Sequence, residues 1–317
     1  MNPYWGSGFF DFFSILFYRL MGKMPLSQLA PDEVQLIILL CITISMGLLG
    51  VFLSLRKMTM LANSLSHTTL LGIVLCFLLL KTPVHTLMMN PLTLLLSSLI
   101  SCCLTLILTE LSHKLFKLQE DASIGLVFTT LFALSILLIT VFTRNAHLGT
   151  EVITGNVDAL SIHDIPYTVL STLGITLVTC LFYRAWVISA FDVEFAYLAG
   201  FSIRFHHIIQ LFLTALALIV SMRAVGVLLA LSFLISPVLI ARQWSKKVSS
   251  LLFLSLSLGL SFSFLGVALS RHILSYTQVP VSTGGLIVTL LSLAYFVSTA
   301  LTFRQKIRFN DSTPLSK

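Results

Sequence analysis

The amino-acid sequence predicts an all-α membrane protein with about nine helices that cross the bilayer. Hydrophobic residues make up 57% of the 317 residues and charged residues only 10%, whereas soluble domains are ~45–50% apolar and ~25% charged. Apolar runs of roughly 18 residues or more recur along the whole chain, and a helix needs about that length to cross the hydrocarbon core. The spans are therefore helices rather than barrel strands, and no soluble domain of useful size remains.

Residues 1–30 are predicted to lie on the membrane surface rather than to cross it. Aromatic and aliphatic side chains fill residues 9–17, but this run is short for a span and contains Asp11, with Arg19 close behind. An amphipathic helix of this kind lies in the membrane interface. No basic residue precedes the apolar part and no small-residue cleavage site follows it, so we expect no cleaved signal peptide.

Residues 31–304 are predicted to form one transmembrane domain, followed by a tail at 305–317. No repeat or Pro/Gly-rich linker divides the domain, and the tail from Asn310 onward is expected to be disordered. The predicted spans are 34–55, 60–80, 91–111, 123–143, 164–183, 205–222, 225–241, 248–270 and 284–303.

The basic residues predict the orientation of these spans. The loops on one side, together with the tail, hold 13 of the 19 lysines and arginines, and the other side holds 6. The richer side is the cytoplasm, so we expect an outer N-terminus, a cytoplasmic C-terminus and a cytoplasmic loop at 184–204. If the N-terminal helix crosses after all, the N-terminus moves inside and the later loops keep their sides. The net charge of +7 thus indicates topology rather than nucleic-acid binding.

The second predicted span carries the polar side chains of greatest interest. Asn63 and His67 are four residues apart and share a helix face, and Ser66 lies on a neighbouring face. His67 lies roughly 15 Å along the helix from the basic pair Arg56 and Lys57, near mid-membrane. Neutral imidazole is a common metal ligand. The face therefore lines a metal path, or it only hydrogen-bonds neighbouring helices.

The other histidines indicate interfaces rather than a metal centre. His206 and His207 are adjacent in a predicted helix and point about 100° apart, so they cannot chelate one ion together. The outer loop at 143–163 holds four possible ligands without regular spacing, which indicates a solvated loop or a docking surface for an outer partner. These four are His147, Glu151, Asp158 and His163.

Ser236 and Pro237 interrupt a predicted span. Proline removes a backbone donor and frees a carbonyl, which membranes tolerate only where protein or a cavity satisfies that carbonyl. The pair is interpreted as a simple kink or as a gate that lines a pore.

One predicted cytoplasmic stretch, Phe191–Gly200, carries acidic and aromatic side chains in a chain with few charges. Asp192 and Glu194 begin about one helical turn that runs through Ala196, and Gly200 is predicted to stop the helix. The chain has no G-x-x-x-x-G-K-[ST] loop to hold phosphates. We therefore interpret this stretch as a contact for a separate ATP-hydrolysing subunit.

No other motif points to catalysis. Serine-hydrolase, zinc-protease and haem-attachment patterns are missing from the sequence. The five cysteines all fall in apolar runs and form no C-x-x-C pair, so they are interpreted as small buried hydrophobes.

Three stretches of the sequence resemble the membrane permease subunits of ATP-driven (ABC) importers for manganese, zinc and iron. Their order and spacing match over roughly residues 35–303. The stretches are Leu55–His67; Asp121–Gly125 with Phe128 and Phe132; and Asp192–Ala196 with Gly200, continuing to Val225–Leu229 and Leu234–Pro237.

The resemblance implies a type II ABC importer fold, like that of the vitamin B12 and siderophore permeases, in a bacterial inner membrane. It implies a second permease subunit, ATPase subunits that bind ATP, and an outer metal-binding protein, with no permanently bound cofactor. It also implies that the helix around Asp192 to Gly200 couples to the ATPase, and that His67 lines the path of the metal.

The sequence departs from the family pattern at one important place. The family's Gly-Asp is Ala62-Asn63 here, and an amide oxygen carries no charge. A second, non-identical permease could supply the carboxylate, or two copies of this chain could form the path.

Two other functions compete with this hypothesis. A secondary transporter driven by an ion gradient usually shows acidic residues within its spans, and the mid-span positions here are almost free of them. A membrane enzyme or electron-transfer subunit would require paired histidines or a polar cluster, and only His67 is clearly mid-span.

Overall fold

The computed structural model describes residues 4, 6, 8–21, 29–80, 91–143 and 156–311, and every regular element in this part of the chain is helical. The helices are α1 (Phe9–Leu20), α2 (Pro31–Leu55), α3 (Thr59–Leu80), α5 (Pro91–Phe116), α6 (Glu120–Thr143), η1 (Val157–Ala159), η2 (Ile162–Asp164), α8 (Ile165–Phe191), α9 (Val193–Leu198), α10 (Ile203–Val225), α11 (Val227–Trp244), α12 (Val248–Thr277) and α13 (Thr283–Asp311).

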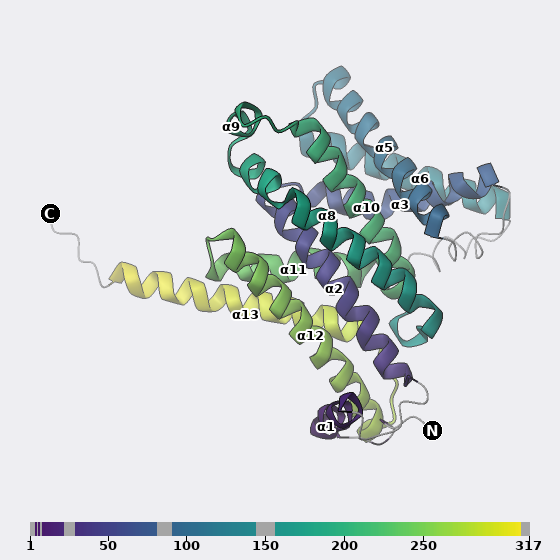
Figure 1. Cartoon of the computed structure of the whole chain (residues 1–317), viewed down its shortest axis with the longest axis vertical. Coiled ribbons are helices and arrows are strands. Elements are labelled where there is room, and N and C mark those ends of the chain that lie inside the picture. The colour runs from purple at the N-terminus through teal and green to yellow at the C-terminus, as the bar shows by residue number, and fades with distance from the viewer. Residues whose placement is uncertain are drawn as a thin grey trace.

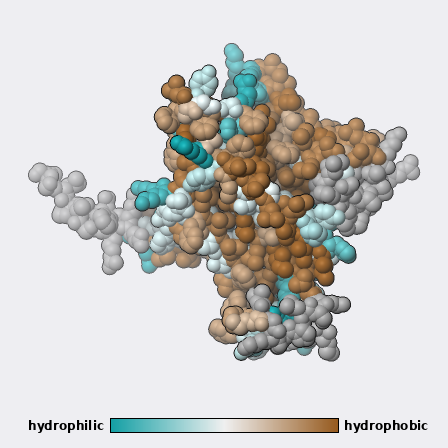
Figure 2. All heavy atoms as spheres, viewed as in Figure 1, coloured by the Kyte–Doolittle hydropathy of each residue, from teal (hydrophilic) through white to brown (hydrophobic). Residues whose placement is uncertain are grey.

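Nine of these described helices are long and apolar enough to cross a membrane. They overlap the nine predicted spans one for one, so the predicted class and number of spans are confirmed. Apolar side chains cover most of the visible face of the molecule (Figure 2), as expected for a surface that contacts lipid tails or other membrane subunits.

Helix α2 runs through the middle of the bundle and packs against α8, α10, α11 and α12 (Figure 1). Glycine and small polar residues bring these helices close together. Gly50 faces the backbone carbonyl of Leu234 on α11, at a spacing that leaves no room for a Cβ. Between α2 and α12 the hydroxyl groups of Thr43 and Ser263 are hydrogen-bonded at 3.0 Å. Such small-residue contacts are the usual means of close helix packing in membranes.

A second group of helices, α3, α5 and α6, lies together at one side of the bundle (Figure 1). Gly72 of α3 lies against the backbone carbonyl of Ser97 on α5, again with no space for a side chain. Helix α10 packs against α3 and α5 as well as against α2 and α8, so it joins the two groups.

Helix α1 lies across the end of the bundle and packs against α12 (Figure 1). A buried ion pair of 2.6 Å between Arg19 and Glu33 ties it to the start of α2, and the Tyr4 hydroxyl donates to the same carboxylate at 2.9 Å. Burial raises the pKa of Tyr4. Phe10 and Phe17 are exposed. With only 12 residues, α1 is too short to cross the hydrocarbon core, which is consistent with the predicted interfacial helix.

Several helices run past the predicted spans. Helix α8 continues from the predicted end at 183 to Phe191, and α13 continues through Asp311 into the predicted tail. Neither extension contains a glycine or proline that would stop a helix. The predicted disorder from Asn310 is therefore wrong for Asn310 and Asp311, and residues 312–317 lie outside the described part.

Replacing Gly50 with alanine should destabilise the bundle. The added Cβ would overlap the Leu234 carbonyl, and a backbone group cannot yield without shifting α11. We expect a loss of about 1–3 kcal/mol, seen as a lower Tm of the purified chain in detergent. The matched control is Gly174→Ala on α8, where a Cβ meets nothing within 4 Å. An equal Tm for the two variants would contradict the close α2–α11 contact.

Candidate functional site

Helix α3 presents Asn63 and His67 on one face, as the sequence predicted. Both are half-buried. The imidazole of His67 lies against two rings of α6, with centroid distances of 5.0 Å to Phe128 and 5.2 Å to Phe132. These two phenylalanines are themselves four residues apart and stacked at 6.1 Å. The matched four-residue spacing of the two pairs is present in the sequence, but only the packing of α3 against α6 shows that the pairs face each other.

The His67 imidazole has a nitrogen that the described residues do not use. Its Nδ1 atom is buried and has no hydrogen-bond partner among these residues, although a buried polar atom normally has one. A neutral imidazole with an unused nitrogen can accept a metal ion. The aromatic walls restrict how the ring can turn, so this nitrogen is held in one place.

Ser66 lies on a different face from Asn63 and His67. It is fully buried, and its hydroxyl donates to the backbone carbonyl of Asn63 at 2.7 Å. The hydroxyl therefore supports the helix locally. The structure brings Asn63 and His67 together and separates Ser66 from them.

Within the described residues, no group of three or more His, Cys, Asp or Glu side chains lies close enough to hold a metal ion. Divalent transition metals are usually held by several such ligands. Asn63 and His67 of one chain are thus an incomplete set, which further ligands from a second chain could complete.

Helix α9 is a separate single-turn element, defined at both ends by its caps. Asp192 closes α8 and starts α9, and its carboxylate accepts from the backbone N–H of Phe195 at 2.9 Å. At the other end Gly200 has φ +83°. The N–H of Gly200 donates to Tyr197 O at 3.0 Å, and that of Phe201 to Ala196 O at 3.1 Å. This is a Schellman cap, and the predicted helix stop at Gly200 is confirmed.

The side chains of α9 divide into one anchor and an exposed face. Ala196 is fully buried, whereas Phe195, Tyr197 and Leu198 are exposed. Glu194 is also exposed. In Figure 1, α9 stands at the top of the bundle, beyond the ends of α8 and α10. An exposed apolar and acidic face at the edge of a membrane protein is typical of a docking surface.

Pro237 lies inside α11, where it is buried and faces the core of the subunit. A Cβ placed on Gly259 of α12 would lie 3.7 Å from its ring. Ser236 beside it is half-buried. The proline therefore lies where α11 packs against α12, close to the α2 contact at Leu234.

A polar cluster joins the helix ends beside α9. Arg56, which follows α2, donates to the Ser189 hydroxyl of α8 at 2.5 Å and lies 3.2 Å from Nδ1 of His207 on α10. Burial lowers the pKa of Arg56. His206 is turned away and its Nδ1 lies 2.7 Å from the carbonyl of Ser202. The two histidines have different partners, as their adjacent positions predicted, but the link from Arg56 to His207 was not foreseen.

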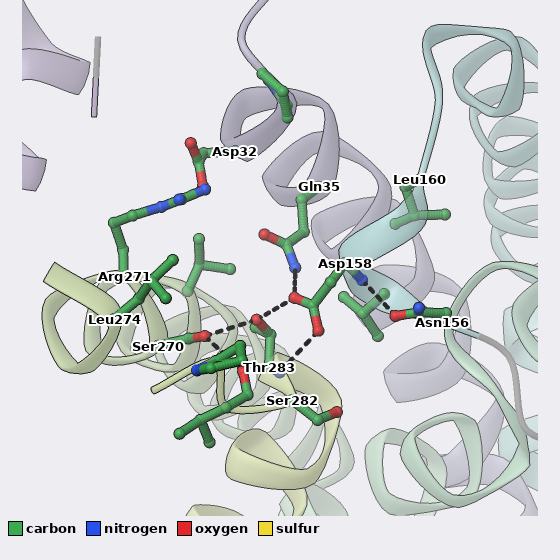
Figure 3. Close-up of a pocket in the computed structure, with 15 residues that line it drawn as sticks. Asp32, Gln35, Asn156, Asp158, Leu160, Ser270, Arg271, Leu274, Ser282 and Thr283 are labelled. Atoms are coloured by element: carbon green, nitrogen blue, oxygen red, sulfur yellow. Dashed lines mark hydrogen bonds and ion pairs between the residues drawn. The ribbon is translucent and has the colours of Figure 1, made fainter. Parts of the chain in front are cut away.

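The opposite end of the bundle holds a cavity of about 680 Å³ between α2, η1, α12 and the start of α13. Figure 3 shows Asp158 at its centre: the carboxylate accepts from Gln35 at 3.0 Å and from the Thr283 hydroxyl at 2.5 Å. Arg271 forms an ion pair with Asp32 beside it. Because its acids are already paired, this cavity is a brace between helices rather than an open ligand set.

The outer-loop residues behave differently from one another. Asp158 belongs to this brace, and His163 is exposed. His147 and Glu151 lie outside the described residues. The predicted choice between a solvated loop and a docking surface stays open.

The fold and the sites described above define the chain as a multi-span membrane protein. Nine of the described helices are long and apolar enough to cross a membrane, one of them carries a half-buried histidine, and a capped helix exposes one face at an end of the bundle. Two solved structures share this fold. One is "PsaBC from Streptococcus pneumoniae in complex with Fab", with TM-score 0.72 and 24% identity, covering 86% of this chain and 92% of that one. The other is "an inward-facing conformation of a putative metal-chelate type ABC transporter", with TM-score 0.63 and 14% identity, covering 87% of this chain and 91% of that one.

Residues 34–302 match the ABC 3 transport family, and the chain belongs to that family. A probable metal transport system membrane protein of Chlamydia pneumoniae is 39% identical, covering 93% of this chain and 91% of the relative. The manganese transport system membrane protein MntD of Bacillus subtilis is 30% identical, covering 68% and 75%. The predicted family and fold class are confirmed. The chain is a membrane permease subunit of an ABC transporter, and ATP hydrolysis belongs to a separate ATPase chain.

Two substitutions of Asp192 distinguish the effect of its charge on α9 from the effect of its hydrogen bond. Asp192→Ala removes the acceptor of the Phe195 N–H and should destabilise α9 by about 0.5–2 kcal/mol. Asp192→Asn keeps an acceptor oxygen and should stay near the parent. Hydrogen exchange of the α9 amides measures the difference. If both variants exchange at the parent rate, the side chain of Asp192 does not hold the helix.

Proposed function

We propose that this chain is the permease of an importer that carries a divalent transition metal ion inward, with manganese as the first candidate and zinc or iron as the others. Transport is driven by ATP hydrolysis on a separate subunit that binds α9. The observation that carries the proposal is α9 itself, a helix capped at both ends that exposes acidic and aromatic side chains beside the spans, in a chain of the ABC 3 transport family.

The metal assignment is supported by the relatives and by the α3 face. Manganese transport is the stated role of MntD of Bacillus subtilis and of the MntC protein of Halalkalibacterium halodurans. In this proposal His67 and Asn63 line the metal path, with Ser66 supporting the helix behind them. The other ligands come from a second permease subunit, either an identical copy or a related chain that supplies a carboxylate where this one has Asn63.

Coupling to the ATPase is assigned to four residues with different tasks. Glu194 contacts the ATPase directly, because its side chain is exposed. Asp192, Ala196 and Gly200 hold the helix: the first caps it, the second anchors it in the bundle and the third ends it. ATP binds to the ATPase, and the permease holds no permanent cofactor.

The remaining assignments are part of the same proposal. Ser236 and Pro237 lie inside α11 at its contact with α12, where a change of helix tilt would act as a gate. Residues 1–30 form the interfacial segment, 31–304 the permease domain and 305–317 the tail. The protein lies in a bacterial inner membrane with α9 and the C-terminus in the cytoplasm, and the N-terminus faces an outer metal-binding protein.

Charge reversal on α9 tests the coupling. Glu194→Lys should abolish co-purification of an ATPase carrying Walker motifs and reduce ATP-dependent metal uptake at least about ten-fold, because like charges across an interface cost several kcal/mol. The matched control is Glu110→Lys, an exposed glutamate near the same end of the bundle, which should leave both unchanged. Retention of the ATPase by the Glu194 variant, as identified by mass spectrometry, would remove α9 from the interface.

Substitutions on α3 test the metal path. Asn63→Asp adds a charged oxygen ligand and should tighten Mn²⁺ binding by about ten-fold, equivalent to about 1.4 kcal/mol. His67→Ala should weaken binding by a similar factor. Isothermal titration of the purified complex with MnCl₂ measures both. If neither variant changes the affinity for Mn²⁺, this face does not line the path, whatever the result at Glu194.

A further inference from the structure

A second cavity lies at the end of the bundle that carries α9. Its volume is about 860 Å³, and it opens between the ends of α2, α8 and α10 and one side of α9. The residues that line it are Leu55, Arg56, Lys57, Met58, Ser189, Ala190, Val193, Tyr197, Ser202, Ile203, Arg204 and His207. Neither the metal path nor the brace at the opposite end involves this cavity.

The lining of the cavity carries an uncompensated positive charge. Arg56, Lys57 and Arg204 all contribute to it, and none of the twelve described residues that line it is acidic. Glu110 of α5 interacts electrostatically with Arg204, but that carboxylate is already paired with Lys114 at 2.6 Å. Three cations gathered around one cavity favour an anionic occupant.

The cations are positioned by the fold rather than left free to separate. The chain turns between α2 and α3 with Lys57 at φ +60°. In that turn the N–H of Met58 donates to Leu53 O at 2.9 Å and that of Lys57 to Ser54 O at 3.2 Å. This hydrogen-bonded turn holds Arg56 and Lys57 side by side at the rim of the cavity.

Arg56 is half-buried and anchored, yet it keeps donors to spare. A guanidinium has five N–H donors and no acceptor. One donor goes to Ser189, and Nδ1 of His207 must accept from another, so the His207 ring is uncharged. The remaining donors of Arg56 have no partner among the described residues. The oxygens of a phosphate group can accept hydrogen bonds from two N–H groups of a guanidinium at once.

The rest of the lining is apolar and comes from Leu55, Met58, Val193, Tyr197 and Ile203. A cavity that joins three cations to an apolar wall at the ends of membrane spans suits an amphiphile better than a free ion. Basic pockets between spans on the cytoplasmic side are known to bind acidic headgroups, since that leaflet carries anionic lipid.

We propose that this cavity binds the phosphate of an anionic phospholipid headgroup from the cytoplasmic leaflet. The proposal rests on the cytoplasmic placement of α9 given above, and it is independent of which metal is carried. Val193 and Tyr197 bring α9 into the lining, so a bound headgroup would hold α9 against the ends of α2 and α10. The lipid would then set the position from which α9 meets its partner subunit.

The test measures lipid retention by the full-length chain, purified with whatever subunits accompany it. The probes are phosphatidylglycerol and phosphatidylcholine, titrated and read by native mass spectrometry. We expect one phosphatidylglycerol to be retained in preference to phosphatidylcholine. Lys57→Gln and Arg204→Gln should each weaken that binding about five-fold. Both side chains are exposed, so their loss leaves the packing intact.

The matched control is Lys246→Gln with Lys247→Gln, two exposed cations at the same end of the bundle that do not line the cavity. These variants should bind phosphatidylglycerol as the parent does. Equal weakening in both sets of variants, or no preference for phosphatidylglycerol in the parent, would overturn the proposal.

Two further arms identify the occupant. Inorganic phosphate is added to the chain in phosphatidylcholine nanodiscs and the Tm is measured; a rise as large as that caused by phosphatidylglycerol would assign the cavity to a soluble phosphate and overturn the lipid. Loss of the lipid whenever an ATPase subunit is bound would assign the cavity to the protein interface and equally overturn it. Retention of the lipid in the Glu194→Lys variant would support the cavity even if the proposed coupling fails.

Discussion

The structure depends on the fact that helices inside a membrane have no water to satisfy their polar groups. Backbone groups are satisfied within each helix, and many side-chain hydroxyls also donate to their own helix: Thr43 donates to Leu39 O, 2.7 Å away, and Ser45 to Cys41 O at 3.0 Å. With these groups internally paired, the helices can approach closely, as α2 and α11 do at Gly50. The close packing around α2 is therefore a consequence of the absence of water in the bilayer core.

Charged contacts are found at the two ends of the bundle, where the helices leave the hydrocarbon core and meet water. At one end Arg271 ties α12 to Asp32 of α2, and Arg223 of α10 pairs with Asp164 at 2.6 Å. At the other end Arg56 joins α2 to α8, and Arg242 of α11 donates to the Ser54 hydroxyl at 3.0 Å. Helix α2 is held at both ends and packed in between, so it forms the stable frame beside which the other helices are placed.

Among the described residues, α3 and α9 carry the two features assigned above to contacts with other subunits, although buried polar atoms without a partner also occur on α5, α6, α8 and α10. In the proposed function, the Nδ1 atom of His67, which has no hydrogen-bond partner among the described residues, belongs to a ligand set that a second permease subunit completes, and the exposed face around Glu194 belongs to the interface with the ATPase. Partly satisfied polar groups in a membrane protein usually mark function. The proposed permease, which shares its metal path with a second permease subunit and is driven by a separate ATPase, would show this combination.

The class of fold, the nine spans and the helix stop at Gly200 could be predicted from the sequence, because each depends on the order of residues along the chain. Run length determines a span, and glycine tolerates the positive φ that ends a helix. The transport family could also be recognised from the sequence, through motifs that resemble it. Only the tertiary structure decided which side chains meet across helices: His67 with Phe128 and Phe132, Arg56 with Ser189 and His207, and Asp158 with Gln35 and Thr283. In these contacts the partners lie between 61 and 151 residues apart in the sequence. The rotation and tilt of the packed helices determine which side chains meet, and hydrophobic periodicity does not encode them.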